Sequence, residues 1–336
     1  MKILIIGGGA VAEMFHIPAS IELFGINNVF IAEPNDIQKQ KVSEKFNLVN
    51  TFKDFHEAIE KVDFVIISTP PQIHKEISIE CINANLPILC EKQLANTLKE
   101  CESIIKSIKI NNRVFAVCHT FRFFPNRIHI RKMINAEYFG NKIYIDIQQG
   151  DPSGWQTVSG YTFRKEFVPG GVLLNEGIHS LDFLLWCFGK PTLVEYLDDS
   201  IGGIESNASM ILNFNNNVKA NFRISRTCTL TNKIMIKGSS KCAELDIYDM
   251  EKITLFQNGE KEIKDMSTEQ PFNWNTIAIY QLQDFLDSIR NNKKPSCDAI
   301  QAAEVIDLIE CCYNIKKSLP LPEKAPIQGL RWGGKK

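Results

Sequence analysis

The sequence has no excess of charge of either sign. Its 336 residues include 38 lysines and arginines and 39 aspartates and glutamates, so the formal net charge is -1. Proteins that bind nucleic acid carry clustered basic surface, and segments that bind acidic membranes carry basic helices. The chain has neither pattern, and we expect no nucleic-acid partner and no membrane partner.

Long hydrophobic runs are missing as well. A membrane-spanning helix needs about 20 consecutive apolar residues, whereas the apolar run at 181–188 is shorter and contains Asp182. The apolar segment at 2–6 is followed by glycines and not by the cleavage site of a signal peptide. We therefore expect a cytoplasmic protein.

The ten cysteines form no C-x-x-C pair. Only Cys311 and Cys312 are adjacent, and neighbouring positions on a helix do not make a ligand pair. We expect reduced, mostly structural thiols and no metal site. The chain also lacks repeats and low-complexity linkers, and its composition is 44% hydrophobic and 23% charged. A globular protein of two domains is the natural expectation at this length.

The first 120 residues alternate short apolar runs with longer amphipathic ones. This rhythm predicts strands at 2–6, 28–32, 64–68, 87–90 and 114–117, and helices at 10–24, 36–46, 75–83 and 97–110. Strands that are apolar throughout are typical of parallel sheets covered on both faces. Residues 1–120 are therefore predicted to form an α/β domain, a doubly wound parallel sheet.

The rhythm changes near residues 119–124. Beyond this boundary the pattern predicts helices at 126–135, 173–188, 275–290 and 298–316, and strands at 142–148, 208–214, 218–225, 233–238 and 243–248. These strands alternate polar and apolar residues, which is typical of a sheet with one covered face. Residues 121–336 are predicted to form an α+β domain, with the tail from Leu319 wrapping the surface.

A glycine-rich turn follows the first predicted strand. Residues 7–12 read Gly-Gly-Gly-Ala-Val-Ala, in which Gly7, Gly9, Val11 and Ala12 occupy a G-x-G-x-x-A fingerprint. The first glycine allows a tight turn, the second lets the backbone approach a pyrophosphate, and the small last residue permits close helix packing. The helix that follows offers free N–H groups to phosphate. The turn predicts a Rossmann dinucleotide site.

Glu33 ends the second predicted strand, 21 residues after Ala12. An acidic residue at about this spacing binds the adenosine ribose hydroxyls in such domains. The next residues, Pro34 and Asn35, provide no arginine for a 2′-phosphate. The pattern predicts NAD as the cofactor.

Two further loops follow strands whose carboxyl ends meet the ligand in a Rossmann sheet. The first contains Thr69 and Pro70 and ends at His74, for which cofactor contact and a loop-stabilising role are both open. The second begins with Glu91 and Lys92. These two charges are predicted to point into the cofactor crevice, although adjacent charges also form simple surface ion pairs.

Together these motifs resemble the glucose–fructose oxidoreductase, inositol dehydrogenase and rhizopine catabolism (Gfo/Idh/MocA) family. The resemblance extends over almost the whole chain. It rests on G-x-G-x-x-A at 7–12, T-P-x-x-x-H at 69–74, E-K at 91–92, R-F-x-P at 122–125 and G-G-V-L-L-N-E-G-I-H-S-L-D at 170–182.

The resemblance implies a Rossmann domain beside an α+β domain with a large, open, mainly antiparallel sheet. It implies a hydroxyl or keto carbon of a sugar, cyclitol or nucleotide-sugar as the reacting group, and a homo-oligomer, dimer or tetramer. Lys92 would lie near the nicotinamide, and His179 would be the acid/base group. A histidine that titrates near neutral pH and a lysine that stabilises oxygen charge suit this chemistry.

Residues around His179 complete the predicted site. Asn175 lies four residues earlier, on the same face of a helix, and Asp182 lies three residues later, where it would orient His179 or contact substrate. For Arg122, contact with a substrate anion and a place in the domain junction are both open. The segment 155–165, with Trp155, Tyr161 and Arg164, is predicted to line the substrate pocket. The remaining histidines are expected to be structural: His16, His56, His119 and His129.

Two positions depart from the family pattern. Gln93 stands in place of the usual proline, and Asn175 stands in place of the usual aspartate, which removes a negative charge near Lys92 and His179. Two alternatives to a sugar-type dehydrogenase or reductase therefore stay open. One is an NAD-dependent glycosidase of the same fold, and the other is a cofactor-binding regulator without activity.

Overall fold

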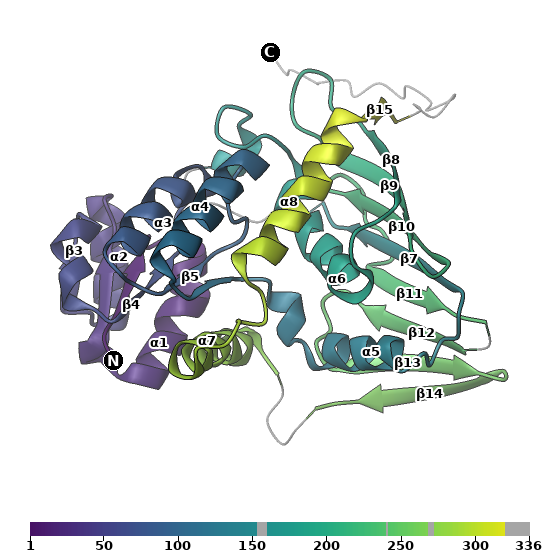
Figure 1. The fold of residues 1–336 in the computed structure, drawn as a ribbon, viewed down its shortest axis with the longest axis horizontal. Coiled ribbons are helices and arrows are strands. Elements are labelled where there is room, and N and C mark those ends of the chain that lie inside the picture. Colours follow the sequence, from purple (N-terminus) through teal and green to yellow (C-terminus); the bar gives the residue numbers. More distant parts are fainter. Residues whose placement is uncertain (153–159, 240, 268–271, 320–336) are drawn as a thin grey trace, which may run out of the picture.

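The computed structural model describes residues 1–152, 160–239, 241–267 and 272–319, which form two β-sheets lying side by side (Figure 1). Trp155 and the tail beyond Leu319, both named above, lie outside the described residues. In the part of the chain that is described, no helix is long and apolar enough to cross a membrane.

The N-terminal sheet has six parallel strands in the order β3-β2-β1-β4-β5-β6. This is the doubly wound Rossmann order. β1, β2 and β4 are buried throughout, which explains their uninterrupted apolar sequences. The bounds are β1 Ile3–Ile6, β2 Val29–Ala32, β3 Asn50–Phe52, β4 Phe64–Ile67, β5 Ile88–Cys90 and β6 Phe115–Val117.

Helices cover both faces of this sheet (Figure 1). They are α1 Ile17–Phe24, α2 Asp36–Phe46, α3 His74–Asn83 and α4 Leu98–Asn111. Short 3-10 turns lie at Ile26–Asn28, Phe55–Glu57, Ile59–Lys61 and Pro71–Ile73. α4 begins with a capping box, in which Thr97 accepts from the Glu100 N–H and Glu100 accepts from the Thr97 N–H.

The helix predicted at 10–24 is two helices joined end to end. A π-helix spans Ala12–His16, and α1 continues from Ile17. Pro18 lies in the first turn of α1, where its missing N–H costs no intrahelical bond. The sequence pattern predicts one continuous helix here and does not indicate the π turn before this proline.

The C-terminal sheet has nine strands, in the order β14-β13-β12-β11-β7-β10-β9-β8-β15. It is mainly antiparallel, with parallel pairs only between β7 and β10 and between β15 and β8 among the described residues. The bounds are β7 Ile143–Gly150, β8 Leu193–Asp198, β9 Asn207–Phe214, β10 Val218–Ser225, β11 Lys233–Lys237, β12 Lys241–Asp246, β13 Lys252–Gln257, β14 Glu260–Asp265 and β15 Lys317–Ser318.

Three helices lie against one face of this sheet, namely α5 Pro125–Asn135, α6 Ile178–Phe188 and α8 Ala299–Asn314 (Figure 1). A π-helix at Leu173–Gly177 precedes α6, and 3-10 turns lie at Thr120–Phe123 and Tyr161–Phe163. The alternating burial along β7, β9 and β10 places their apolar side chains in the core under these helices.

The seventh helix, α7 at Trp274–Asn291, returns to the N-terminal domain although it lies far downstream of the predicted boundary. Leu282 and Phe285 share a buried cluster with Ile3 and Phe64 of the Rossmann sheet. The rings of Phe64 and Phe285 meet edge to face with centroids 5.7 Å apart. The division at residue 120 therefore separates the two sheets but not all of the helices that cover them.

We predict a homo-oligomer built on the outer face of the nine-stranded sheet. The helices lie on the opposite face (Figure 1), and Ile211 and Met235 are half-buried apolar residues at the outward positions of β9 and β11. Apolar residues on an uncovered sheet face favour association. Light scattering at micromolar concentration should give two or four times the chain mass of 38.2 kDa. A monomer would refute the prediction.

Candidate active site

The glycine-rich turn fits a dinucleotide. Gly7 has a φ of +98°, and a Cβ there would lie 2.6 Å from the Ser68 carbonyl oxygen, so only glycine fits. Gly9 has no atom within 4 Å of the place where a Cβ would lie. Its backbone therefore borders open space, where a pyrophosphate approaches in such folds. Val11 and Ala12 begin the helix whose N-terminus faces the same space.

Glu33 follows β2 and turns its carboxylate toward the glycine-rich turn. Its Oε2 accepts a hydrogen bond from the Gly8 N–H at 2.8 Å, and its Oε1 accepts one from the Asn35 N–H at 2.9 Å. The side chain is partly exposed, and each carboxylate oxygen has a second lone pair. Glu33 can therefore still accept hydrogen bonds from ribose hydroxyls.

We predict that NADH binds at least about tenfold more tightly than NADPH. A 2′-phosphate beside the Glu33 carboxylate would meet like charge, and tenfold corresponds to only about 1.4 kcal/mol. Calorimetric titration of both cofactors measures the ratio. The ratio should shrink in Glu33→Gln and stay unchanged in Glu60→Gln, an exposed control. Equal affinity of the wild-type protein for the two cofactors would contradict the prediction.

His74 lies between two loops, in a position that fits the loop-stabilising role left open above. The side chain is fully buried, with Nδ1 2.8 Å from the Gln93 carbonyl oxygen and Nε2 2.9 Å from that of Thr69. Burial lowers the pKa of His74 more than these carbonyls raise it. His74 thus joins the two loops. Thr69 and Pro70 remain partly exposed in its loop.

Glu91 is held by a histidine from the dinucleotide-binding helix. Its Oε1 lies 2.8 Å from His16 Nε2, and its Oε2 accepts a hydrogen bond from the Lys92 backbone N–H at 3.0 Å. Burial opposes ionisation of Glu91, but the contacts with His16 and Lys92 outweigh it and lower the pKa of Glu91. These contacts fix the backbone from which the Lys92 side chain starts.

Lys92 reaches from the first domain to the second. Its Nζ donates a hydrogen bond to the Asn175 carbonyl oxygen at 2.6 Å. Burial lowers the pKa of Lys92, and Glu91 and Glu176 nearby offset part of this effect. The peptide bond between Lys92 and Gln93 is cis. The structure thus brings together Lys92 and the turn that contains Asn175.

His179 lies in the first turn of α6, close to this pair. Its ring stacks on Phe121 with centroids 5.3 Å apart, and its Nδ1 is buried with no hydrogen-bond partner among the described residues. Burial lowers the pKa of His179 well below its usual range, and Lys92 and His119 lower it further. These effects favour the neutral form of the ring, which is the form that accepts a proton.

A small pocket lies where the two domains meet. Its lining residues are Pro71, Lys92, Gln93, Tyr161, Thr162, Val168, Gly170, Leu174 and Asn175. Of the two predicted pocket residues in the described part of segment 155–165, only Tyr161 lines it. Burial, together with Glu91, raises the pKa of Tyr161 to about 12, so its hydroxyl remains a hydrogen-bond donor. Arg164 is exposed and lies over the Phe167 ring.

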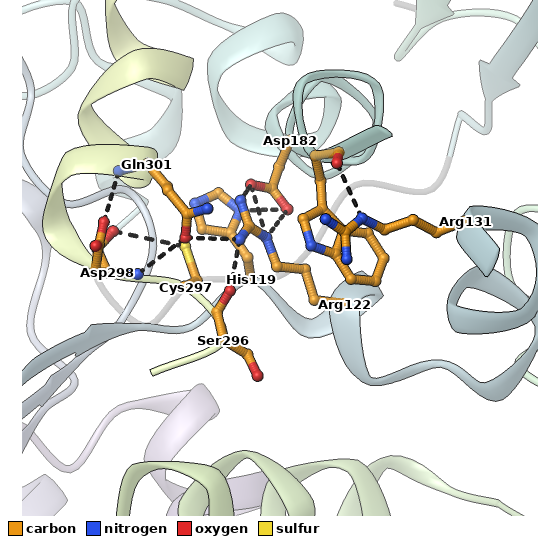
Figure 2. A network of polar contacts seen from close by, with 9 residues as sticks. His119, Arg122, Arg131, Asp182, Ser296, Cys297, Asp298 and Gln301 are labelled. Carbon is orange, nitrogen blue, oxygen red and sulfur yellow. Dashed lines mark hydrogen bonds and ion pairs between the residues drawn. The ribbon is translucent and has the colours of Figure 1, made fainter. Parts of the chain in front are cut away.

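Asp182 pairs with Arg122 and does not orient His179, which corrects the expectation above (Figure 2). Its carboxylate accepts hydrogen bonds from Arg122 Nε at 2.9 Å and Nη2 at 2.7 Å, and both side chains are buried. Arg122 also donates to the Ser296 carbonyl oxygen at 2.6 Å and to Gln301 at 3.0 Å. Arg122 therefore belongs to the domain junction, and neither residue faces the pocket that Lys92 lines.

Two groups of buried or partly buried side chains contain residue types that bind metals. One comprises His16, Glu91 and Cys118, and the other comprises His119, Asp182 and Cys297. In the first group two members, His16 and Glu91, contact each other, and in the second group Arg122, which is not a member, already pairs with the Asp182 carboxylate. We propose no metal at either position.

Two adjacent glycines fix the turn before Asn175. A Cβ at Gly171 would lie 1.9 Å from the Glu205 carbonyl oxygen, and one at Gly170 would lie 1.9 Å from the Tyr313 hydroxyl. The buried Glu205 carboxylate accepts hydrogen bonds from the N–H groups of Gly171 at 2.7 Å and Leu173 at 3.0 Å. This carboxylate satisfies the start of the helical segment and sets the position of the Asn175 turn.

Three ionisable residues near the site are not indicated by any motif in the sequence. One is His16, which follows the fingerprint on the same helix, and this proximity is its only signal. Glu176 directly follows Asn175, and Arg226 directly follows β10. Arg226 Nε lies 3.4 Å from Glu176 Oε1. A position at a strand end was the available signal for Arg226.

Comparison with known families agrees with this architecture. A family described as "Oxidoreductase family, NAD-binding Rossmann fold" matches residues 1–119, and its "C-terminal alpha/beta domain" matches residues 131–318. The chain belongs to the Gfo/Idh/MocA oxidoreductase family. This membership confirms the predicted fold class and NAD as the cofactor of the Rossmann domain.

Characterised Gfo/Idh/MocA proteins differ considerably from this chain in sequence. It is 28% identical over 201 residues to 4-carboxy-2-hydroxymuconate-6-semialdehyde dehydrogenase of Sphingobium sp. (strain NBRC 103272 / SYK-6), which covers 56% of this chain and 60% of that protein. It is 23% identical over 305 residues to scyllo-inositol 2-dehydrogenase (NADP(+)) IolU of Bacillus subtilis (strain 168), covering 88% and 90%. The match thus spans less than two thirds of the Sphingobium enzyme.

Solved Gfo/Idh/MocA structures share the fold over nearly the full length. Levoglucosan dehydrogenase in complex with NADH and L-sorbose superimposes with a TM-score of 0.81. The superposition covers 94% of this chain and 96% of that one at 18% sequence identity. At this identity the likeness establishes the common fold.

Proposed function

We propose that this protein is an NAD-dependent oxidoreductase of the sugar-dehydrogenase type. The reacting group is a hydroxyl or keto carbon of a sugar, a cyclitol or a nucleotide-sugar. The main support for the proposal is the hydrogen bond from Lys92 to the Asn175 carbonyl oxygen. Both residues line a pocket between the NAD-binding domain and the second domain. His179 lies on the helix that follows this turn.

The side chains suit an alcohol–carbonyl interconversion. NAD, when bound, accepts or supplies the hydride. Lys92, as an ammonium ion, stabilises negative charge that develops on the reacting oxygen. In its neutral form His179 can take the hydroxyl proton during oxidation, and it returns this proton during reduction.

The residues that line the pocket suit a polar ligand that is rich in hydroxyl groups. Tyr161 and Asn175 line it beside Lys92 and Gln93, and these side chains offer donors and acceptors suited to hydroxyl groups. The names of two relatives support the same substrate class, because one is a cyclitol dehydrogenase and the other is a sugar-type dehydrogenase in complex with L-sorbose. The identity of the substrate within this class is the question for experiment.

A substrate panel tests the proposal. The purified protein is mixed with NAD and each member of a set of sugars, cyclitols and nucleotide-sugars, while the NADH absorbance at 340 nm is followed. We expect at least one member to produce NADH with saturation kinetics, and the His179→Ala variant to lose most of this activity. Glycoside cleavage without net formation of NADH would favour the glycosidase. If neither NADH formation nor glycoside cleavage occurs, the result would favour the regulator.

A further inference from the structure

His119 is a buried histidine beside the site, and the proposed function gives it no role. It lies just after β6, and its side chain is 1% exposed. Neither of its ring nitrogens has a hydrogen-bond partner among the described residues. Buried polar atoms in proteins are almost always hydrogen-bonded, because an unpaired one costs free energy. The two unpaired nitrogens of His119 therefore call for a partner or a function.

The ring of His179 adjoins the ring of His119. The two centroids are 6.5 Å apart, and the ring planes are nearly perpendicular, at 76°. His179 is partly exposed as a whole, but its Nδ1 atom is buried and has no hydrogen-bond partner in the described structure. Three unpartnered ring nitrogens thus belong to two neighbouring rings, of which one carries out the proposed proton transfer.

The distance between the rings is too long for a direct hydrogen bond. Even with two nitrogens turned toward each other, rings at this separation leave a gap longer than the roughly 3 Å of an N–H···N contact. One water molecule that makes two hydrogen bonds of about 2.9 Å each spans such a gap. Buried water molecules in proteins pair with polar groups of this kind. The geometry therefore suits a single water molecule between the two rings.

Asp182 approaches His119 from α6 (Figure 2). Its Oδ2 lies 3.5 Å from His119 Nδ1, which is longer than an ordinary hydrogen bond. The carboxylate still favours a proton on this nitrogen, because the positive end of the N–H dipole then points toward the negative charge. Burial lowers the pKa of His119 to about 4, although Asp182 opposes this effect. A neutral ring with its proton on Nδ1 keeps a lone pair on Nε2.

We propose that His119 is a positioning residue for His179. Through one buried water molecule, His119 Nε2 accepts a hydrogen bond from the Nδ1–H group of His179, which leaves Nε2 of His179 as the atom that exchanges a proton with substrate. Asp182 acts on His179 only through His119. The importance of this arrangement for turnover rests on the proposed function, in which His179 is the acid/base group, but the tautomer of His179 can be measured without substrate.

Other charged and titratable groups also act on these two rings. Besides Asp182 they are Lys92, Glu91, Arg122 and Cys297. Lys92 acts on both rings, and the Cys297 Sγ atom lies within 4.8 Å of the His119 and Asp182 ligand atoms. Substitutions at His119 leave all of these groups in place. A change at His179 in such variants therefore reports the loss of the His119 ring nitrogens.

Nuclear magnetic resonance of the histidine rings in the full-length protein tests the inference. The chain has six histidines, so ¹⁵N-labelled histidine gives few signals, and the signals that disappear in His179→Gln belong to His179. At pH 7 we expect the neutral ring of His179 in the wild-type protein to carry its proton on Nδ1. His119→Phe keeps a ring and removes both nitrogens, and we expect a mixture of both His179 tautomers in this variant.

Two amide variants separate a hydrogen-bonding role from a packing role. His119→Gln places an amide oxygen near the position of Nε2 and should keep the wild-type tautomer of His179. His119→Asn ends near the position of Nδ1 and should give the mixture. His56→Phe, at an exposed position, should leave the His179 signals unchanged. If His119→Phe does not fold, the wild-type tautomer and the comparison of His119→Gln with His119→Asn still decide the matter.

Where a substrate is found, kinetics give a second readout. His119→Phe should lower kcat at least about tenfold, which is part of the roughly 10²- to 10⁴-fold that a positioned acid/base group contributes. The KM and the Kd for NADH should stay within about twofold of wild type, because His119 touches neither ligand in the proposed arrangement. His119→Gln should keep most of kcat.

A wild-type His179 with its proton on Nε2, on both nitrogens, or divided between the two tautomers at pH 7 would overturn the inference. So would a proton that stays on Nδ1 in both His119→Phe and His119→Asn. Failure of the proposed function is a separate result, namely no turnover of any substrate by the wild-type protein, and it leaves the tautomer measurement intact.

Discussion

We expect the replacement of Lys92 by methionine to lower kcat by about 10²- to 10⁴-fold, the usual cost of removing a positioned charge or proton donor from a reaction centre. Methionine keeps the length of the side chain and removes the ammonium group that donates to the Asn175 carbonyl oxygen. The Kd for NADH stays within about twofold of wild type, because the glycine-rich turn and Glu33 are untouched.

Steady-state kinetics and calorimetric NADH titration of Lys92→Met check this expectation. Lys99→Met serves as the matched control, since Lys99 is an exposed lysine of α4 outside the site, and it should behave as wild type. A Lys92→Met enzyme with near-normal kcat would remove Lys92 from the reaction. A large loss of NADH affinity would instead make Lys92 a cofactor-binding residue.

The second large effect is on stability. Asp182→Ala leaves the buried guanidinium of Arg122 without its carboxylate, and breaking a buried ion pair by removing one partner costs about 3–5 kcal/mol. Asp182 is fully buried and Arg122 is 4% exposed, so water does not replace the lost contact. The pair joins the 3-10 turn Thr120–Phe123 to α6 (Figure 2).

Urea unfolding of the full chain, followed by circular dichroism, measures this change. Asp307→Ala is the matched control, because its ion pair with Lys190 is exposed and should contribute only about 0–1 kcal/mol. The double variant Asp182→Leu/Arg122→Met should recover part of the loss, since neither charge of this pair is then left buried without its partner. A similar small effect from Asp182→Ala and Asp307→Ala would show that the buried pair contributes little.

Strands that are buried along their whole length could be predicted from the sequence. β1, β2 and β4 are buried along their whole length, so each appears as an uninterrupted apolar run. β14, by contrast, reads Glu-Lys-Glu-Ile-Lys-Asp, and its side chains are almost all exposed at the sheet edge. A polar edge strand has no apolar alternation, and it forms because β13 offers hydrogen bonds along its free side.

Parts of the site depended on contacts that no local pattern encodes. The spacing of Asn175, His179 and Asp182 predicts one face of an α-helix, but Leu173–Gly177 is a π-helix with a wider turn. Asp182 pairs with Arg122 and not with His179, because the Arg122 guanidinium, 60 residues away along the chain, lies next to it in space. Glu91 and His16 are separated by 75 residues for the same reason.

The cofactor site could be predicted because each of its motifs lies within a short stretch of the sequence. Gly7 and Glu33 each act within one strand–turn–helix unit, where sequence spacing fixes spatial distance. The reaction site is assembled from two domains, and only the resemblance to a known family connected Lys92 with the segment at 170–182. The contact between Glu176 and Arg226 beside this site required the structure.

Transfer of deuterium from the cofactor tests the central claim most directly. The protein is incubated with NADH carrying deuterium at both C4 positions of the nicotinamide and with a panel of keto-sugars, keto-cyclitols and keto-nucleotide-sugars, and the products are weighed by mass spectrometry. We expect one deuterium on the new carbinol carbon of at least one product, and little or none with Lys92→Met. Deuterium that stays on the cofactor with every acceptor, in a protein that binds NADH tightly, would contradict the account.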